Sequence, residues 1–198
     1  PLELAVAVLR AGRLDEAQAR VRAILEEHPQ HPDALHLLGV IALHGGDAQA
    51  AATSLARAVA IEPGNAAFHS DLGNAFHACG DADGAVRCFA TAVELAPEAA
   101  PLHFNLGNAL NLKGLPEDAL PAYRRAIEME PDNPVYHNNL GNTYQELGRL
   151  DEAARALEQA VALEPRYVDA LYNLGLVHEA REDHEAAIEA YRRVLDQA

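Results

Sequence analysis

One glycine returns every 34 residues along the whole chain. The series is Gly39, Gly73, Gly107, Gly141 and Gly175, and prolines 29, 63, 97, 131 and 165 keep the same spacing. A strict period of this length indicates a stack of similar supersecondary units, each packed on its neighbours, rather than one globular core. We therefore expect a single array over residues 1–198 with no internal domain boundary. Its units are 1–31, 32–65, 66–99, 100–133, 134–167 and 168–198.

The unit 134–167 shows the expected local structure most clearly. Its first half carries Tyr136, Leu140 and Tyr144, three or four residues apart, as on one face of an amphipathic helix. Gly148 interrupts this pattern, and a second apolar face follows. Each predicted helix has about 13 residues and is roughly 20 Å long.

Small residues at fixed positions explain how the two helices of a unit pack. The glycine at position eight and an alanine at position twenty, such as Gly141 and Ala153, let two helix backbones approach closely. A large side chain there would overpack the contact, at a cost of about 1–3 kcal/mol. The alternation of small and large residues therefore predicts a helix hairpin in every unit.

These positions resemble the tetratricopeptide repeat (TPR). Asn-Leu-Gly-Asn occurs at 105–108 and again at 139–142, and Tyr144, Ala153, Ala160 and Pro165 follow where the family's pattern requires them. The resemblance covers the whole sequence. It implies an all-α, right-handed superhelical solenoid of six antiparallel helix hairpins that binds other proteins and is not itself an enzyme.

The chain departs from the family's pattern at a few positions. Three histidines, His69, His103 and His137, stand where the family has a large aromatic residue, and we expect them to fill space between helices. Glu182 replaces the glycine of the turn in the last unit. These changes loosen local packing, but we expect every hairpin to form.

The first helices of the units carry a row of polar residues opposite their packing side. At about 100° per residue, positions two, five, six, nine, twelve and thirteen share one arc, and in this family the first helices line a concave groove. The candidate peptide-binding residues there are Asn74, Asn105, Asn108, Asn138, Asn139, Asn142, Asn173, Phe104 and Tyr172. An amide side chain donates and accepts hydrogen bonds. We therefore expect this solvent-facing row to bind the backbone of an extended peptide largely regardless of its sequence.

The position-six asparagines are similar to a ladder in the TPR superhelix of O-linked N-acetylglucosamine transferases. Asn105, Asn139 and Asn173 match that ladder, whereas Leu37 and Asp71 interrupt it in earlier units. The resemblance implies contacts to a substrate backbone. The alternative is that these asparagines, which are common in the family, only solvate the groove.

Three functions remain open on these observations. The first is a protein–protein interaction scaffold that binds an extended segment of a partner. The second is the substrate-recognition region of a larger glycosyltransferase-type enzyme whose catalytic domain is absent here. The third is self-assembly through uncapped ends, because the chain begins at Pro1 and no capping helix follows its last unit. We expect a fragment of a longer protein whose ends associate.

Charge narrows the choice of partner. The net charge is −15, which opposes binding to nucleic acid or to an anionic membrane surface. The groove positions hold no Lys or Arg, so the carboxylate clamp of chaperone-binding TPR proteins is missing. A protein or peptide ligand that is neutral to basic, rather than an acidic tail, fits better. A solvated helical surface is the other explanation of the charge.

Catalysis has little support in the sequence. The three adjacent residues His69, Ser70 and Asp71 point in different directions on a helix and cannot form a triad with one another. Ten of the thirteen glycines stand at position eight or fifteen, which leaves none for a phosphate loop. We therefore expect no catalytic residue, no cofactor and no metal site.

The two cysteines and the apolar runs bear on location. Cys79 and Cys88 are nine residues apart, which suits neither a metal pair nor a redox motif. We expect two small buried thiols and a cytoplasmic location. The longest apolar run, residues 4–9, is far too short to span a membrane.

Overall fold

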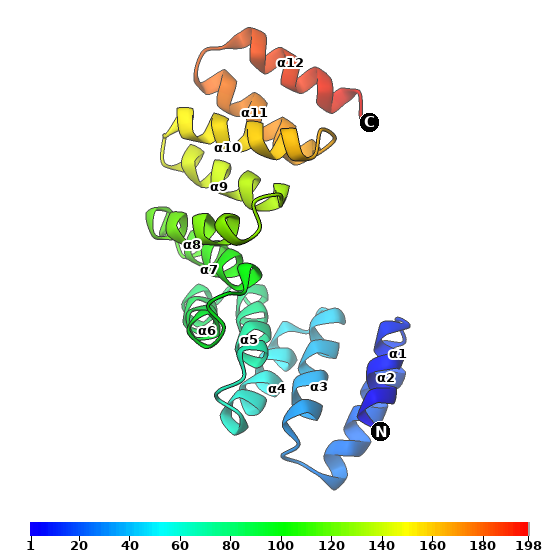
Figure 1. The fold of residues 1–198 in the computed structure, drawn as a ribbon. Helices are drawn as coiled ribbons and strands as arrows, with labels where there is room; N and C mark the ends of the chain where they lie inside the picture. The colour runs from blue at the N-terminus through cyan, green and yellow to red at the C-terminus, as the bar shows by residue number, and fades with distance from the viewer. Residues whose placement is uncertain (198) are drawn as a thin grey trace. The chain divides into compact units, whose positions relative to one another are not determined.

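In a computed structural model, which describes residues 1–197, the chain is all-α (Figure 1). Within that range it forms twelve helices and no strand. They are α1 (Leu2–Arg10), α2 (Leu14–Glu27), α3 (Pro32–His44), α4 (Ala48–Ile61), α5 (Ala66–Ala78), α6 (Ala82–Leu95), α7 (Ala100–Leu112), α8 (Pro116–Met129), α9 (Pro134–Glu146), α10 (Leu150–Leu163), α11 (Val168–Ala180) and α12 (His184–Leu195). Successive helices pair into the six hairpins that the period predicts, so the predicted fold class is confirmed.

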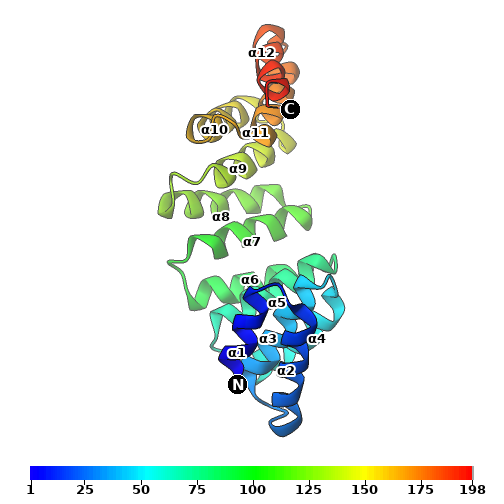
Figure 2. The same ribbon diagram turned by 90° about the vertical axis from the view of Figure 1, so that its right-hand side faces the viewer.

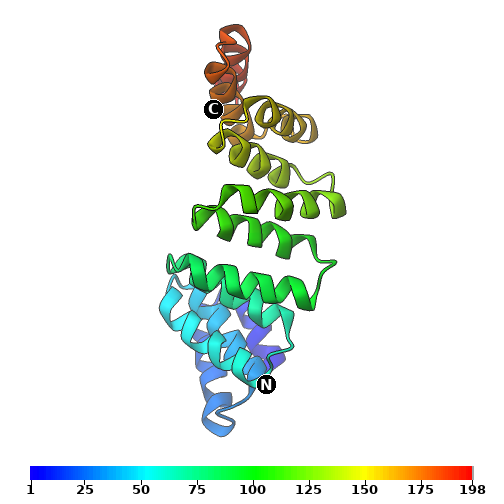
Figure 3. The ribbon, with the colours of Figure 1, turned by 90° about the vertical axis from the view of Figure 1, so that its left-hand side faces the viewer.

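The helices form two compact units, one ending at Pro97 and the other beginning at Glu98. The first unit contains the hairpins from α1 to α6, and the second those from α7 to α12. Figure 2 shows α7 and α8 lying side by side, and Figure 3 shows the same pair from the opposite direction. A single array running across the two units stays a prediction.

The first helices of each unit are stacked on one another. In the first unit α3 contacts both α1 and α5, and in the second α9 contacts both α7 and α11. Successive second helices make no comparable contact within the described residues. The first helices therefore lie on the inner side of each stack, and we call the side of α7, α9 and α11 that bears positions five, six, nine and twelve the inner face of the second unit.

The position-eight glycines are required by close packing. A Cβ built at Gly39 would lie 2.4 Å from Leu55 Cγ, and one at Gly141 would lie 2.6 Å from Leu157 Cγ. Real carbon atoms do not approach so closely, because the packed interior has no room to yield. Leu55 and Leu157 are both fully buried. The predicted role of the small residue at this position is confirmed.

Each turn inside a hairpin contains one residue in the left-handed backbone conformation. Five turns have glycine there, with φ between 69° at Gly148 and 79° at Gly46, and the sixth has Glu182 at φ 63°. The Glu182 turn still closes, because the backbone N–H of Asp183 donates to the carbonyl of His178 at 2.9 Å. The sixth hairpin thus forms as expected, although its turn holds a side chain in a strained conformation.

Replacing Glu182 with Gly is expected to raise the free energy of unfolding by about 1 kcal/mol, because glycine adopts a left-handed φ without steric cost. Urea denaturation followed by circular dichroism measures the change. The opposite substitution in another turn, Gly148→Ala, serves as the control and should destabilise by a similar amount. A loss of stability in Glu182→Gly would contradict the prediction.

Two of the position-four histidines bond to the backbone of a turn as well as packing between helices. The imidazole Nε2 of His69 lies 2.9 Å from the Pro63 carbonyl, and that of His137 lies 2.8 Å from the Pro131 carbonyl. Since a carbonyl only accepts, each ring must donate an N–H. Both histidines are half-buried. The expectation that they only fill space is therefore incomplete.

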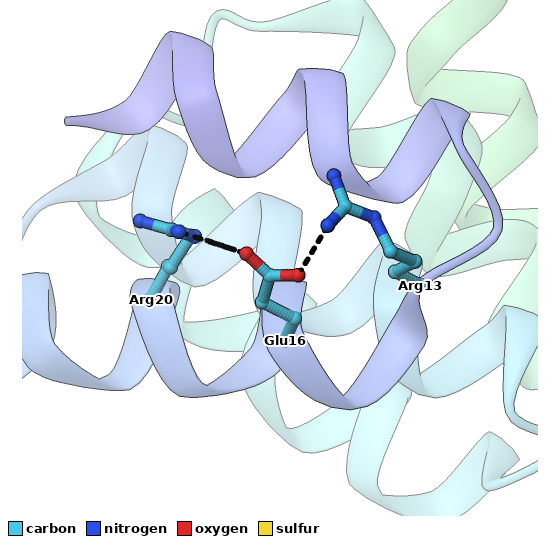
Figure 4. A network of polar contacts seen from close by, with 3 residues as sticks. All are labelled: Arg13, Glu16 and Arg20. Carbon is cyan, nitrogen blue, oxygen red and sulfur yellow. Dashed lines mark hydrogen bonds and ion pairs between the residues drawn. The ribbon is translucent and has the colours of Figure 1, made fainter.

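A charged cluster stands at the start of α2 (Figure 4). Glu16 accepts hydrogen bonds from Arg13 at 2.7 Å and from Arg20 at 2.8 Å. The bond from Arg20 is the main reason why the pKa of the Glu16 carboxyl is lowered. A carboxylate in the first turn also suits the helix dipole.

Among the described residues, no helix combines the length and the apolar character that crossing a membrane requires.

Candidate functional site

The predicted asparagine row is divided between the two units. Asn74 lies on α5 in the first unit, and the other asparagines lie on α7, α9 and α11 in the second. Those in the second unit are half-buried except for Asn138, which is 5% exposed. The expectation that the whole row faces solvent is therefore wrong for Asn138.

Four of these side chains form a continuous chain of amide hydrogen bonds across three helices. Asn173 Nδ2 on α11 donates to Asn138 Oδ1 on α9 at 3.0 Å. Asn138 Nδ2 donates to Asn139 Oδ1 at 3.2 Å. Asn139 Nδ2 then donates to Asn108 Oδ1 on α7 at 2.9 Å. The asparagines therefore hold the first helices together as well as facing the inner side.

Two residues that the sequence did not single out extend this network. The Tyr123 hydroxyl of α8 donates to Asn108 Oδ1 at 2.8 Å and accepts from Asn111 Nδ2 at 3.2 Å. Asn111 Nδ2 also donates to the Thr143 hydroxyl at 2.7 Å, and Thr143 donates to the Asn139 carbonyl at 2.8 Å. Tyr123 and Thr143 are essentially fully buried. The sequence could have pointed to both residues, because each has a hydroxyl group at a position where packing requires only a side chain of suitable size.

Position six does not play the same role in every repeat. Asn139 is bonded to Asn108, and Asn173 is bonded to Asn138. Asn105 makes no side-chain hydrogen bond within the described residues of its unit. A backbone-binding ladder like that of the O-linked N-acetylglucosamine transferases stays a prediction. Its three asparagines are not equivalent here, and removing Asn139 or Asn173 would also remove contacts between helices.

The network leaves donors and acceptors unused. A primary amide offers two N–H groups and a carbonyl with two lone pairs. Within the described residues, Asn108 accepts two hydrogen bonds but its Nδ2 donates none, and Asn173 donates one but its Oδ1 accepts none. In the same part of the chain, the buried Oδ1 atoms of Asn111 and Asn142 accept none. An unpaired buried acceptor costs about 1–3 kcal/mol, so these amides can gain by meeting a donor.

The two predicted aromatic residues differ in exposure. Phe104 is half-buried, with its ring centroid 4.7 Å from that of Tyr136 and 5.9 Å from that of Tyr123, and it packs with the core. Tyr172 is 50% exposed and lies against Tyr191 at 5.9 Å. Tyr172 is therefore the aromatic group that a ligand on the inner face would meet.

Burial also changes the acidity of the core tyrosines. Desolvation raises the pKa of the Tyr123 hydroxyl well above its ordinary value. Desolvation, with a smaller effect from the Glu130 carboxylate, raises the pKa of Tyr136 to about 12. Both hydroxyls are therefore neutral at physiological pH, and Tyr123 is a hydrogen-bond donor to the network.

In the first unit, a similar hydrogen bond joins two first helices, α3 and α5, through different residues. Asp71 Oδ2 accepts from His36 Nε2 at 2.6 Å, and Asp71 Oδ1 accepts from Asn74 Nδ2 at 3.4 Å. The His36 ring stacks on Phe68 at 4.6 Å. His36 and Asp71 occupy positions five and six of successive repeats, as Asn138 and Asn173 do. The same register thus joins first helices in both units.

Two remaining features are the side chains that can ligate a metal ion and the two thiols. Over residues 1–197, no three His, Cys, Asp or Glu side chains gather closely enough to hold a metal ion. Cys88 is buried, and desolvation raises the pKa of its thiol. Cys79 is exposed. The expectation of two buried thiols is therefore wrong for Cys79, which stands where its helix ends.

Stacked helix hairpins with small residues at each crossing define a helical-repeat protein. A sequence model of the tetratricopeptide repeat matches residues 2–66, 70–134 and 138–198. The chain belongs to the tetratricopeptide repeat family. No match is found among curated proteins.

Solved structures share this fold over most of their length. MamA from Desulfovibrio magneticus RS-1 is 22% identical with a TM-score of 0.79, over 84% of this chain and 94% of that one. YrrB, described as a TPR protein with an unusual peptide-binding site, is 22% identical with a TM-score of 0.73, over 89% and 91%. TTC0263, a thermophilic TPR protein from Thermus thermophilus, is 27% identical with a TM-score of 0.65, over 95% and 97%. These similarities establish the fold.

Proposed function

We propose that this chain is a non-catalytic interaction scaffold that binds an extended segment of a partner protein along the inner face of the second unit. The observation that carries the proposal is the amide network of α7, α9 and α11. Its side chains are already ordered by one another, and it keeps a spare donor at Asn108 and a spare acceptor at Asn173. The amide of Asn105 on α7 lies outside this network and is also available to a ligand. Fixing a free side chain on binding costs about 0.5–1.5 kcal/mol, and here that cost is largely met on folding.

The chemistry of this face favours a neutral or basic segment. An extended peptide presents alternating N–H and C=O groups, which amides can pair with whatever the side chains are. The same first helices, α9 and α11, also carry the exposed carboxylates Glu146, Asp169 and Glu179. Tyr172 supplies an exposed aromatic surface beside Asn173. The peptide-binding site in the description of YrrB supports the class of ligand but does not place it.

A cytoplasmic location is part of this proposal. A substrate-recognition region of a glycosyltransferase-type enzyme and self-assembly through the ends stay predictions from the sequence. The inner face is compatible with the first of these, because such an enzyme would also hold its substrate by the backbone.

The scaffold proposal is tested by a pull-down from lysate of the host with Asn105→Ala/Tyr172→Ala beside the wild-type chain. Asn105 lies outside the hydrogen-bond network and Tyr172 is exposed, so folding should be preserved. We expect partner capture to fall about tenfold or more, the effect of roughly 1.4 kcal/mol or above.

The control is Gln49→Ala, which removes an exposed amide from the second helix α4. It should capture the same partners as the wild type, and melting curves should match for all three proteins. Equal capture by the wild type and the inner-face variant would show that this face does not bind.

A further inference from the structure

A second concave site lies on the other layer of the second unit, between the second helices α8 and α10. It is a cleft of about 610 Å³, open to solvent. Leu140 and Tyr144 of α9 form its floor together with Ile127 and Ala156, and Arg124 and Arg155 stand on its walls. Both α8 and α10 pack on α9, which therefore closes the bottom of the cleft.

The floor is rigid because its central aromatic ring is fixed from two sides. The Tyr144 hydroxyl accepts a hydrogen bond from Arg124 at 2.6 Å. The guanidinium of Arg149 lies 4.7 Å from the centroid of the same ring, within the range of a cation–π contact. Leu140, Tyr144 and Ala156 are each less than a tenth exposed. The cleft thus has an apolar base that needs little ordering before a ligand binds.

The charges around the cleft leave a cationic excess. Two carboxylates, Glu128 and Glu152, line it, but Arg125 donates to Glu128 at 3.0 Å and Arg149 donates to Glu152. Within the described residues, Arg155 forms no hydrogen bond or ion pair, although its charge is near enough to Glu152 to help lower the pKa of that carboxyl. Arg124 is bonded to a neutral phenol. Arg125 also contacts Glu98 at 3.4 Å, so four guanidinium groups in and around the cleft stand against three carboxylates.

This excess of positive charge is unusual for the chain as a whole. The protein carries a net charge of −15, and its inner face has no Lys or Arg at the groove positions. A guanidinium that is not bonded to a carboxylate, beside an apolar floor, favours a ligand that combines a carboxylate with an apolar group. A basic ligand would meet Arg124 and Arg155 as like charges.

We propose that the α8–α10 cleft is a second binding site, distinct from the inner face, which takes an acidic segment of a partner protein. An apolar side chain of that segment rests on Leu140, Tyr144 and Ala156, and its carboxylates pair with Arg124 and Arg155. Each wall is a helix of 14 residues, roughly 20 Å long, so the cleft suits a peptide segment. The two faces would then select ligands of opposite charge.

The test is a selection of random peptides displayed on phage against the whole chain, repeated with Arg124→Gln/Arg155→Gln. Arg22→Gln/Arg87→Gln, which removes two exposed arginines from the second helices α2 and α6, is the matched control. We expect wild-type selection to enrich peptides with Asp or Glu next to an apolar residue. Their affinity should fall about tenfold or more in the cleft variant, remain in the control, and weaken as salt rises.

Other outcomes would overturn the proposal. One is a selection without acidic peptides, and another is acidic peptides that bind the cleft variant as well as the wild type. Loss of their binding in Asn105→Ala/Tyr172→Ala would place them on the inner face instead. Self-association of the wild-type chain in sedimentation, abolished by the cleft variant, would make a second copy of this acidic protein the occupant.

Discussion

Replacing Gly107 with Leu is expected to lower the free energy of unfolding by about 3 kcal/mol or more. A Cβ at this position would lie 2.7–2.9 Å from three atoms of the Tyr123 ring. That ring is 1% exposed, and its hydroxyl is bonded to Asn108 and Asn111. The ring therefore cannot move aside without breaking the network. Overpacking alone costs about 1–3 kcal/mol, and the lost hydrogen bonds add to it.

Urea denaturation followed by circular dichroism measures this effect. Gly64→Leu is the matched control, because a Cβ at Gly64 meets nothing within 4 Å and its backbone is not left-handed. The control should change stability by no more than about 0.5 kcal/mol. A similar loss in both variants would mean that the cost comes from the leucine itself, and not from the crossing of α7 and α8.

The repeat period predicted the hairpins, their turns and the close helix crossings. These features depend on local geometry that recurs in every unit. A left-handed residue must close each turn, as Gly148 does, and a small residue must stand under each large one, as Gly141 does under Leu157. Glu182 shows that the period holds even when one residue breaks the pattern, because packing on both sides still requires the turn.

The amide network could not be predicted from the period alone. The angular argument placed Asn138 on the solvent side, but first helices of successive repeats pack closely enough to bury it. Position six also changes partner, since Asn139 finds an asparagine at position nine and Asn173 finds one at position five. A period fixes the position of a residue, whereas a hydrogen bond depends on which residue the preceding repeat offers.

The α8–α10 cleft was missed for a similar reason. Its arginines stand on exposed helix faces, where charged residues usually only solvate a surface. The sequence feature that could have revealed the cleft is at position eleven of the repeat. Tyr144 has a hydroxyl group there, whereas the corresponding residues Ala42, Phe76, Leu110 and His178 have none. Only the structure shows that this hydroxyl meets Arg124 across the helix layer.

Removing the Tyr123 side chain is expected to have the other large effect on stability. Tyr123→Ala should cost about 3–5 kcal/mol, because the ring is fully buried and a cavity would remain. Tyr123→Phe keeps the ring and should cost about 1–2 kcal/mol, since Asn108 still accepts from Asn139 and Asn111 still donates to Thr143. The same urea titration gives both values.

Comparing these two variants separates packing from the network. Tyr167→Phe, which removes the hydroxyl of a half-buried tyrosine outside the network, is the control and should change stability by less than about 0.5 kcal/mol. If the amides are held in place for a ligand, Tyr123→Phe should weaken partner capture as well as stability, although Tyr123 is buried and touches no ligand. If it lowers stability and leaves capture unchanged, the network serves only to join α7, α8 and α9, and binding on the inner face must depend on Asn105 and Tyr172.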